Sequence, residues 1–263
     1  MNELRLGDKK LAQHVKKIQN AIRKKVDEAG AKGVVVGLSG GVDSAVVATL
    51  ASGVVDTTAL IMPDEITDKK DIKNAEGLAK KLGIEYEIVK IEGIWASVNE
   101  DFPFAEFDNK NKKISLGNVK ARVRMMLLYL TANLDNRLVL GTGNRSEILL
   151  GYCTKYGDAG VDFLPIGDLY KTQVRELAEY LEVPKRIREK IPTAGLWRGQ
   201  TDEAEIGMDY GTLDKTLYCL VNKKLSVAET AKKLDRNIGD IIKIKRRIDS
   251  SAHKREMPRI VKL

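Results

Sequence analysis

The sequence contains few cysteines and few histidines. Its 263 residues include two of each, and the two cysteines, Cys153 and Cys219, stand far apart. There is no Cys-x-x-Cys pair and no cluster of cysteine with histidine. These absences exclude a disulfide framework and a structural zinc site. They also leave no Ser-His-Asp or Cys-His pattern of the kind that supports nucleophilic catalysis.

Long apolar runs are absent as well. Residues 1–8 lack the apolar core of a signal peptide. No run approaches the roughly 20 apolar residues that a membrane-spanning helix needs. We therefore expect a soluble, cytoplasmic protein that does not bind a membrane.

The composition is that of an ordinary globular protein, with 43% hydrophobic and 31% charged residues. A chain of this length buries roughly 70–75% of its unfolded surface, so a substantial core is expected. No linker rich in Pro, Gly or Ser divides it, and residues 1–263 are predicted to form a single domain. The net charge of +8 fits a nucleic acid, a polyphosphate substrate or a solvated lysine-rich surface. The motifs below favour the polyphosphate, and we expect no nucleic-acid partner.

Short β-branched runs alternate with segments of helical periodicity. Strands are predicted at residues 34–38, 57–62, 84–91 and 137–140. Helices are predicted at residues 11–30, 42–51, 68–82, 118–134 and 172–181. This alternation predicts an α/β fold, a doubly wound parallel sheet of the Rossmann-like type. The helix at 118–134 is apolar on much of its circumference, which predicts burial in the core or against a partner chain.

Two regions fall outside this alternation. Residues 99–117 contain Pro103, two asparagines and several lysines, and are predicted to form a loop. Additional C-terminal helices are predicted at residues 209–222, 227–234 and 238–248. Residues 226–248 have the spacing of a helix-turn-helix. Most such helix pairs are packing elements, so a DNA-binding module is the weaker alternative.

The most informative stretch is Gly37-Leu-Ser-Gly-Gly-Val-Asp-Ser44, directly after the apolar run 34–36. A strand, a glycine-rich turn and a helix together offer backbone N–H groups and a helix N-terminus to phosphate. The turn contains no lysine, so it is not the P-loop pattern Gly-x4-Gly-Lys-Ser/Thr. It resembles instead the pyrophosphate-binding loop Ser-Gly-Gly-x-Asp-Ser of the ATP pyrophosphatases, which activate a substrate oxygen with AMP.

Two carboxylates are candidates for a metal site. If the strands at 34–38 and 137–140 are neighbours, residues 39–44 and 142–147 face the same crevice beyond the carboxyl ends of the strands. Asp43 and Glu147 each lie near the start of the following helix. Mg²⁺ beside a triphosphate takes one or two carboxylates and keeps several waters. The alternative is that each acid is simply favoured by a helix dipole.

A lysine and two irregular segments add to this crevice. Lys171 stands at the start of the helix at 172–181, where a cation opposes the helix dipole. This position indicates an adjacent anion, for which a phosphate is the expected source. Residues 155–162 and 191–207 mix glycine, acidic and small residues and are predicted to form loops. Such loops on a rigid scaffold commonly bind substrate, although a surface turn is the alternative for each.

Together, these segments resemble the ammonia-dependent NAD synthetase family. The matching stretches run in family order over most of the chain: 37–44, 141–147, 155–162, 164–173, 191–196, 199–207 and 253–254. The pyrophosphate loop is shared by the whole superfamily, whereas Lys-Tyr-Gly-Asp at 155–158 and Pro-Thr-Ala-Gly-Leu at 192–196 are more specific. The resemblance implies that ATP adenylylates the carboxylate of deamido-NAD, with release of pyrophosphate. Ammonia then displaces AMP to give NAD.

The resemblance also implies roles for individual residues. It implies that ATP is bound by Gly37, Leu38, Ser39, Gly40, Gly41, Val42, Asp43, Ser44, Thr142, Lys171 and Thr193. It implies that deamido-NAD is contacted by Arg122, Lys155, Asp162, His253 and Lys254. Asp43 and Glu147 become the Mg²⁺ ligands, and Asp43 and Lys171 the catalytic groups. The family site lies at a homodimer interface, for which the helix at 118–134 is the candidate here.

One absence bears on the nitrogen source. Glutamine-using relatives carry a large amidase domain, for which this chain has no room, so free ammonia is the expected donor.

Two other ATP pyrophosphatases remain as alternatives. A GMP synthetase would act on xanthosine monophosphate, and a tRNA-thiolating enzyme would need a reactive cysteine. Only Cys153 is near the expected site.

Overall fold

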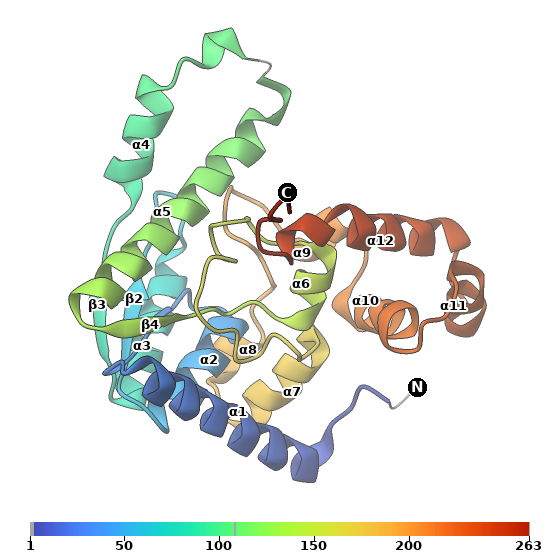
Figure 1. The fold of residues 1–263 in the computed structure, drawn as a ribbon, viewed down its shortest axis with the longest axis horizontal. Helices are drawn as coiled ribbons and strands as arrows, with labels where there is room; N and C mark the ends of the chain where they lie inside the picture. The colour runs from blue at the N-terminus through green and yellow to red at the C-terminus, as the bar shows by residue number, and fades with distance from the viewer. Residues whose placement is uncertain (1–2, 108, 263) are drawn as a thin grey trace.

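A four-stranded parallel β-sheet forms the centre of the molecule (Figure 1). The structure is a computed structural model that describes residues 3–107 and 109–262. The strands are β1 (Gly33–Gly37), β2 (Thr57–Ile61), β3 (Glu85–Ile88) and β4 (Arg137–Leu140), in the order β3-β2-β1-β4. The predicted parallel sheet is therefore confirmed. The third strand is shorter than predicted and lies at the edge, where its residues are mostly exposed.

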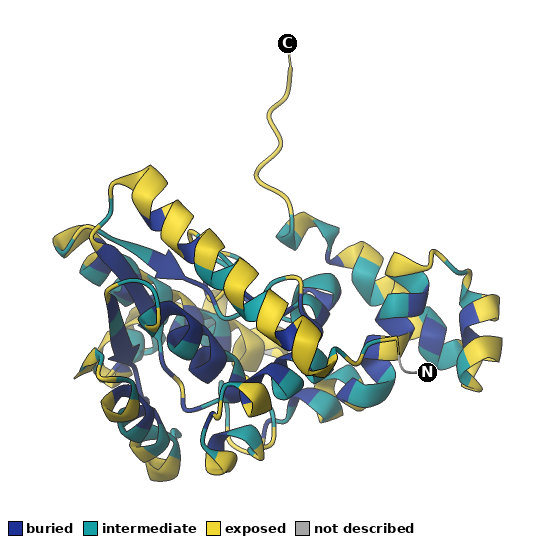
Figure 2. Ribbon diagram, turned by 90° about the horizontal axis from the view of Figure 1, so that it is seen from below, coloured by how far each residue is buried: buried dark blue, intermediate teal, exposed yellow. Residues whose placement is uncertain are grey.

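One face of the sheet is covered by a thick layer of helices. These are α1 (Gly7–Ala29), α2 (Val42–Ser52), α3 (Lys69–Leu82), α7 (Lys171–Tyr180) and α8 (Lys185–Arg188). Their apolar residues join Val34 and Val36 of β1 in the largest hydrophobic cluster. Figure 2 shows that buried residues concentrate in the sheet and in the helix next to it. Helix α2 is central to this layer because it contacts α1, α3, α7 and α8 as well as the sheet.

The other face is covered mainly by α5 (Lys112–Leu134), which packs on β1 and β4. Val35 of β1 points to this side, as expected because successive side chains of a strand alternate between the two faces. It joins Val123, Leu128 and Ala132 of α5 in a second, smaller cluster. With helices on both faces the sheet is doubly wound, as predicted. The chain leaves β1 toward one edge of the sheet and returns as β4 on the other side of β1, so the strand order reverses there.

The prediction of a loop over residues 99–117 is wrong for much of its length. Helix α4 (Glu92–Asp101) covers its start, short 3₁₀ turns follow at η1 (Phe104–Glu106) and η2 (Asn109–Asn111), and α5 begins at Lys112 rather than at residue 118. Asp108 lies outside the described residues. Helix α4 has no fully buried residue. Ile94, Trp95 and Val98 nevertheless stand at helical spacing, and Trp95 packs against the smaller cluster, so the sequence carried a signal for this helix that was not recognised. It lies beside α5, and the two extend together from the body (Figure 1).

A helical layer made mainly of C-terminal helices lies beside the sheet. It is made of α6 (Arg145–Leu150), α9 (Asp202–Ile206), α10 (Tyr210–Leu217), the π-helical turn η3 (Tyr218–Asn222), α11 (Val227–Leu234), α12 (Ile238–Ser250) and η4 (Ala252–Lys254). The predicted tail helices are confirmed, except that the first one changes to π geometry after Leu217. A third cluster, centred on Tyr210, Leu213 and Leu217, joins these helices. Among the described residues, no helix is both long and apolar enough to cross a membrane.

Candidate active site

The loop between β1 and α2 is a compact turn that its own serines hold in shape. The Ser44 hydroxyl donates to the Gly41 carbonyl at 3.1 Å and accepts from the Ser39 N–H at 3.2 Å. Gly40 adopts a φ of +74°, and a Cβ there would lie 2.5 Å from the Asp71 carbonyl oxygen, so only glycine fits. The strand, turn and helix predicted from Gly37–Ser44 are therefore present. The turn opens at the N-terminus of α2, beyond the carboxyl end of β1.

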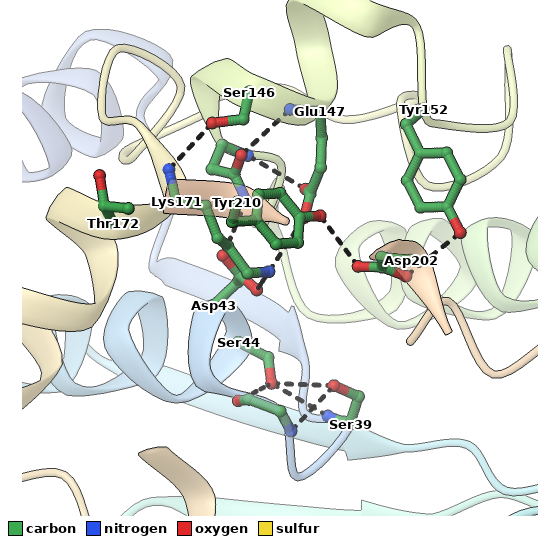
Figure 3. Close-up of polar contacts among 12 residues, drawn as sticks. Ser39, Asp43, Ser44, Ser146, Glu147, Tyr152, Lys171, Thr172, Asp202 and Tyr210 are labelled. Atoms are coloured by element: carbon green, nitrogen blue, oxygen red, sulfur yellow. Dashed lines mark hydrogen bonds and ion pairs between the residues drawn. The ribbon is translucent and has the colours of Figure 1, made fainter. Parts of the chain in front are cut away.

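The predicted metal ligands and the predicted phosphate-binding lysine meet at this point. The Lys171 Nζ lies 2.5 Å from Asp43 Oδ2 and 3.1 Å from Glu147 Oε1. The lysine side chain is 3% exposed and each carboxylate 17%, so the three charges are largely removed from water. Figure 3 shows Lys171 extending between the two acids, with Tyr210 beside them. The predicted anion next to Lys171 thus exists, but in this structure it is a pair of carboxylates.

The pairing of β1 with β4 explains why these acids meet. Val36 of β1 is opposite Leu140 of β4, so the segments that follow the two strands leave the same edge of the sheet. Asn144 follows β4 and caps α6, accepting from the Glu147 N–H at 3.1 Å. Its amide also donates to Asp43 at 2.9 Å and so joins the two segments. The sequence pattern Asn144-x-x-Glu147 is typical of a capping box at the start of a helix, and it was not recognised from the sequence.

The charge states follow from burial and pairing. Burial raises the pKa of Glu147 to about 7, while the Lys171 ammonium acts in the opposite direction. Burial also acts to lower the pKa of Lys171, but attraction to Asp43 and Glu147 outweighs it, and the pKa lies above its ordinary value. The site therefore retains a charged ammonium at neutral pH.

Two adjoining cavities open along this edge of the sheet. One, of about 420 Å³, is lined by the Gly41–Ser44 turn together with Lys171 and Thr193. The other, of about 640 Å³, is lined by apolar side chains from α5, from the sheet and from residues 194–197, together with Lys254. Thr142 lines both. The structure therefore brings together the residues expected to bind ATP, in a site with room for a second, larger ligand beside the phosphate loop.

Three of the five residues expected to bind deamido-NAD lie close together, and one of them, Lys254, lines the larger cavity. The Lys155 ammonium donates to the His253 carbonyl at 2.8 Å. Lys254 donates to the carbonyls of Gly151 and Cys153, both at 2.7 Å. The 155–162 segment is irregular, as predicted, because it consists of turns between α6 and α7. These contacts hold the 155–162 segment and the end of the chain against each other.

The other two residues, like Lys155 and His253, line neither cavity. Arg122 is exposed on α5, where its guanidinium donates to the Lys155 carbonyl at 3.3 Å. The carboxylate of Asp162 accepts from the Tyr129 hydroxyl at 2.9 Å and from the Val139 N–H at 2.8 Å. Both residues lie on the side of the molecule that α5 covers. Arg122 is therefore next to Lys155, whereas neither Arg122 nor Asp162 lines the cavity at Lys171.

Three further buried polar residues lie around Lys171 and were not identified from the sequence: Asp202, Tyr210 and Asp214. Asp202 accepts from the Tyr210 hydroxyl at 2.9 Å and from the Tyr152 hydroxyl at 3.2 Å. Asp214 is fully buried on α10. These residues are more than 30 positions from Lys171 in sequence and belong to no local motif, so only packing brings them to it. The one available signal is an acid among the apolar residues of the inner face of α10, at Asp214 between Leu213 and Leu217.

Cys153 does not have the properties of a reactive thiol. It is partly buried, and burial together with the Asp158 carboxylate raises its pKa to about 11. The thiolate is the reactive form, and at neutral pH this side chain is almost entirely protonated. The tRNA-thiolating alternative therefore receives no support from the site.

Comparison with known proteins gives a consistent result. The family described as NAD synthase matches residues 14–258. An NH3-dependent NAD⁺ synthetase of Archaeoglobus fulgidus is 46% identical over 253 residues, covering 95% of this chain and 96% of the relative. Two solved structures each align with 96% of this chain and 99% of their own. They are NMN synthetase from Francisella tularensis (TM-score 0.83, 36% identity) and NH3-dependent NAD synthetase from Campylobacter jejuni (TM-score 0.79, 34% identity). The phosphate loop, the convergent charges and these matches together establish that the chain belongs to the NAD synthase family.

Proposed function

We propose that this protein is an ammonia-dependent ligase that uses ATP to convert deamido-NAD to NAD, releasing AMP and pyrophosphate. The observation that carries the proposal is the meeting of Asp43, Glu147 and Lys171 next to the phosphate-binding turn. Membership of the NAD synthase family and the similarity to NH3-dependent synthetases support it. GMP synthetase activity and a nucleic-acid-binding module have no comparable support.

ATP would bind with its phosphates along the Gly37–Ser44 turn. Backbone N–H groups and the N-terminus of α2 are oriented there toward an anion. Lys171 would neutralise charge on the phosphates, and Thr142 and Thr193 would contact the nucleotide from the two cavities they line. We expect Lys171 to contribute most in the transition state, because charge develops on the phosphate oxygens as pyrophosphate leaves.

Asp43 and Glu147 fit the requirements of a magnesium site. Their oxygens already converge on one cation, the Lys171 ammonium, so the geometry needed to hold a positive charge is present. Among residues 3–107 and 109–262 there is no group of three or more acidic, histidine or cysteine side chains arranged for a metal. Two carboxylates are sufficient for Mg²⁺, which otherwise keeps water and phosphate oxygens. When bound, the ion would neutralise the triphosphate.

The chemistry requires alignment more than a strong nucleophile. A carboxylate oxygen of deamido-NAD attacks the α-phosphorus of ATP, a P–O bond forms, and the bond to pyrophosphate breaks. Neutral ammonia then attacks the acyl carbon, loses a proton, and displaces AMP as the leaving group. Fixed positive charge and backbone N–H groups lower the barrier of the first step by stabilising the charge that develops on the phosphate oxygens.

The working form that we propose is a homodimer with α5 at its interface. Met126, Leu130 and Leu134 follow Arg122 at intervals of four residues, so all four lie along one side of the helix. The three apolar side chains are 49%, 53% and 80% exposed. A second copy covering this stripe would bury them and would approach Arg122 and Asp162, which lie away from Lys171 in one chain. This accounts for substrate-binding roles of Arg122 and Asp162 in a shared site.

The remaining parts of the proposal concern the chain as a whole. Residues 1–263 would act as one domain. Lys254, which lines the larger cavity, would complete the binding of deamido-NAD together with Lys155 and His253. The nitrogen donor would be free ammonia, as in the names of the NH3-dependent relatives. The cytoplasm, where ATP is abundant, is the proposed location.

A second candidate function is the amidation of nicotinate mononucleotide to NMN. One observation favours it: among the solved structures, the F. tularensis NMN synthetase has a TM-score of 0.83 with this chain. The two reactions share the activated carboxylate and the incoming ammonia. They differ only in whether the substrate carries an adenylate half.

The test is a turnover assay with purified protein, ATP, Mg²⁺ and ammonium, and with either deamido-NAD or nicotinate mononucleotide. We expect NAD, AMP and pyrophosphate in equal amounts from the dinucleotide, and a much lower kcat/KM for the mononucleotide. A preference for the mononucleotide would replace the first function by the second. Pyrophosphate release without an amide product would contradict the amidation step, and no turnover with either substrate would overturn the proposal.

A further inference from the structure

Helix α10 approaches the site from the side opposite to the phosphate-binding turn. It packs against both α6 and α7, the helices that carry Glu147 and Lys171 (Figure 1). Tyr210 and Asp214 stand one turn apart on its inner face, and both are completely buried. A buried carboxylate is costly unless its oxygens receive hydrogen bonds. The groups that donate hydrogen bonds to Asp214 therefore indicate which part of the structure it stabilises.

Asp214 stabilises the first turn of α7. Its Oδ2 accepts from the Thr172 N–H at 2.8 Å, and its Oδ1 accepts from the Ser146 hydroxyl at 2.5 Å. The Ser146 oxygen in turn accepts from the Lys171 N–H at 3.0 Å (Figure 3). The first N–H groups of a helix have no partner within the helix. Here a single carboxylate from another helix satisfies two of them, one directly and one through a serine.

This arrangement links two residues of the site through the backbone. Ser146 directly precedes Glu147 on α6, and Lys171 directly precedes Thr172 on α7. Fixing Ser146 against the Lys171 N–H therefore fixes the starts of α6 and α7 relative to each other. Asp214 thus controls the separation of the Glu147 carboxylate from the Lys171 ammonium, although it contacts neither charged group.

Tyr210 contacts the ammonium end of the Lys171 side chain. Its ring centroid lies 5.2 Å from the Lys171 Nζ, which is within the range of a cation–π contact. Its hydroxyl donates to Asp202, whose other hydrogen bond comes from Tyr152 (Figure 3). The ring is therefore held in place by its hydroxyl and in turn limits where the ammonium can lie.

We propose that Asp214 and Tyr210 are positioning residues of the reaction, which hold Lys171 in register with Asp43 and Glu147. This inference rests on the proposed function, because it gives Lys171 a role in the transition state. It assigns to the C-terminal helices a part in the chemistry at the sheet edge. Neither residue touches the phosphate-binding turn, so neither is a catalytic residue.

The main test is the Asp214→Asn variant, assayed for NAD formation at saturating substrates. An asparagine keeps the shape and can accept from only one of the two donors with its single oxygen, which frees the start of α7 to shift. Because a displacement of about 1 Å at a reacting group costs on the order of 10²-fold, we expect kcat to fall 10- to 100-fold. The KM for ATP is expected to change less than about threefold, since ground-state binding by the turn is intact.

A double-mutant cycle separates positioning from general damage. In a Lys171→Ala background, Asp214→Asn should have little further effect on kcat, because the group it positions is already absent. Asp209→Ala is the matched control on the same helix: Asp209 caps α10 through the Thr212 N–H at 3.0 Å and is exposed. It should lower the melting temperature and leave kcat unchanged. If Asp214→Asn does not fold, Ser146→Ala and Tyr210→Phe provide the same measurement with smaller losses.

A kcat for Asp214→Asn equal to that of the wild type would overturn the proposal, as would an undiminished loss in the Lys171→Ala background. Either result would leave the proposed function intact, because the wild type would still form NAD. A wild-type protein that forms no NAD would instead overturn the proposed function, and this inference with it.

Discussion

Helices α2 and α5 both carry runs of apolar residues, at 45–48 and 125–130, but their surroundings in the structure differ. In α2, eight of eleven residues are buried, whereas in α5 only six of twenty-three are. Helix α2 lies between the sheet and a layer of other helices, whereas one side of α5 faces the sheet and the other faces outward.

The difference shows what an apolar circumference predicts and what it does not. An apolar surface predicts that other residues will pack against the helix, but not whether those residues belong to the same chain. For α2, residues of the same chain pack against it. For α5 the stripe of Met126, Leu130 and Leu134 remains open, which is the basis of the proposed dimer. The predictions below compare the effects of substitutions in the two helices.

The largest effect is expected at the charged site to which α2 contributes Asp43. Asp43→Ala or Glu147→Ala should remove most turnover by weakening the binding of magnesium with ATP, and Lys171→Ala should cost about 10²-fold or more in kcat. Circular dichroism should show an unchanged fold for each variant. Near-normal rates in both acidic variants would refute the metal assignment, and an unchanged rate for Lys171→Ala would remove that residue from the site.

A matched pair of truncations compares the packing of the two helices. Leu50 of α2 is completely buried, so Leu50→Ala should reduce the free energy of unfolding by about 2–5 kcal/mol. Leu130 of α5 is 53% exposed, and Leu130→Ala should change the stability of the monomer by less than about 0.5 kcal/mol. Urea unfolding at low protein concentration measures both. Equal losses would mean that α5 is packed as tightly as α2.

The inner side of α5 is expected to make the protein sensitive to acid. Lys120, buried on α5, donates to Asp64 at 2.9 Å. Burial acts to raise the pKa of Asp64, but hydrogen bonds from Thr67 and Lys120 and the charge of Arg124 outweigh it, so the pKa is lowered. The stabilisation is therefore complete above the ordinary pKa of 3.8 and is lost as the pH falls through the lowered value.

Asp64→Asn tests this contribution. Removing one partner of a buried ion pair costs roughly 3 kcal/mol when the other is left unpaired. Lys120 keeps its ion pair with Glu65 at 2.8 Å, so the variant should lose less than this at neutral pH. Its stability should also vary less than that of the wild type between about pH 5 and pH 2. Thermal unfolding over this range checks both expectations. An unchanged pH dependence would show that other carboxylates dominate the acid response.

The smallest effect on stability, but a clear one on assembly, is expected from Leu130→Glu. A charge in the centre of the exposed stripe of α5 should convert a dimer to a monomer in sedimentation experiments and leave the fold intact. Tyr180→Glu is the control, because Tyr180 is also exposed but lies on α7, on the other face of the sheet. A wild-type monomer, or a dimer that tolerates Leu130→Glu, would contradict the proposed interface.

Much of the fold was predictable because its signals are local. β-Branched runs mark the strands, and Gly40, with its positive φ and close neighbour, can only be glycine. The phosphate-binding turn is a continuous segment, so the sequence contains all of it. Helix α4 also had a local signal, because Ile94, Trp95 and Val98 stand at helical spacing, but it was not recognised beside the polar residues that follow.

The site itself was only partly predictable. The sequence identified Asp43, Glu147 and Lys171, but their contact depends on β4 lying next to β1, across more than a hundred residues. The positions of Asp202, Tyr210 and Asp214 depend on how the C-terminal helices pack. The sequence by itself therefore determined the parallel α/β architecture and the phosphate-binding turn, because backbone conformation and periodicity are local properties. Only the tertiary structure decided which charges converge on Lys171 and which side of α5 stays open, because long-range packing brings those side chains together.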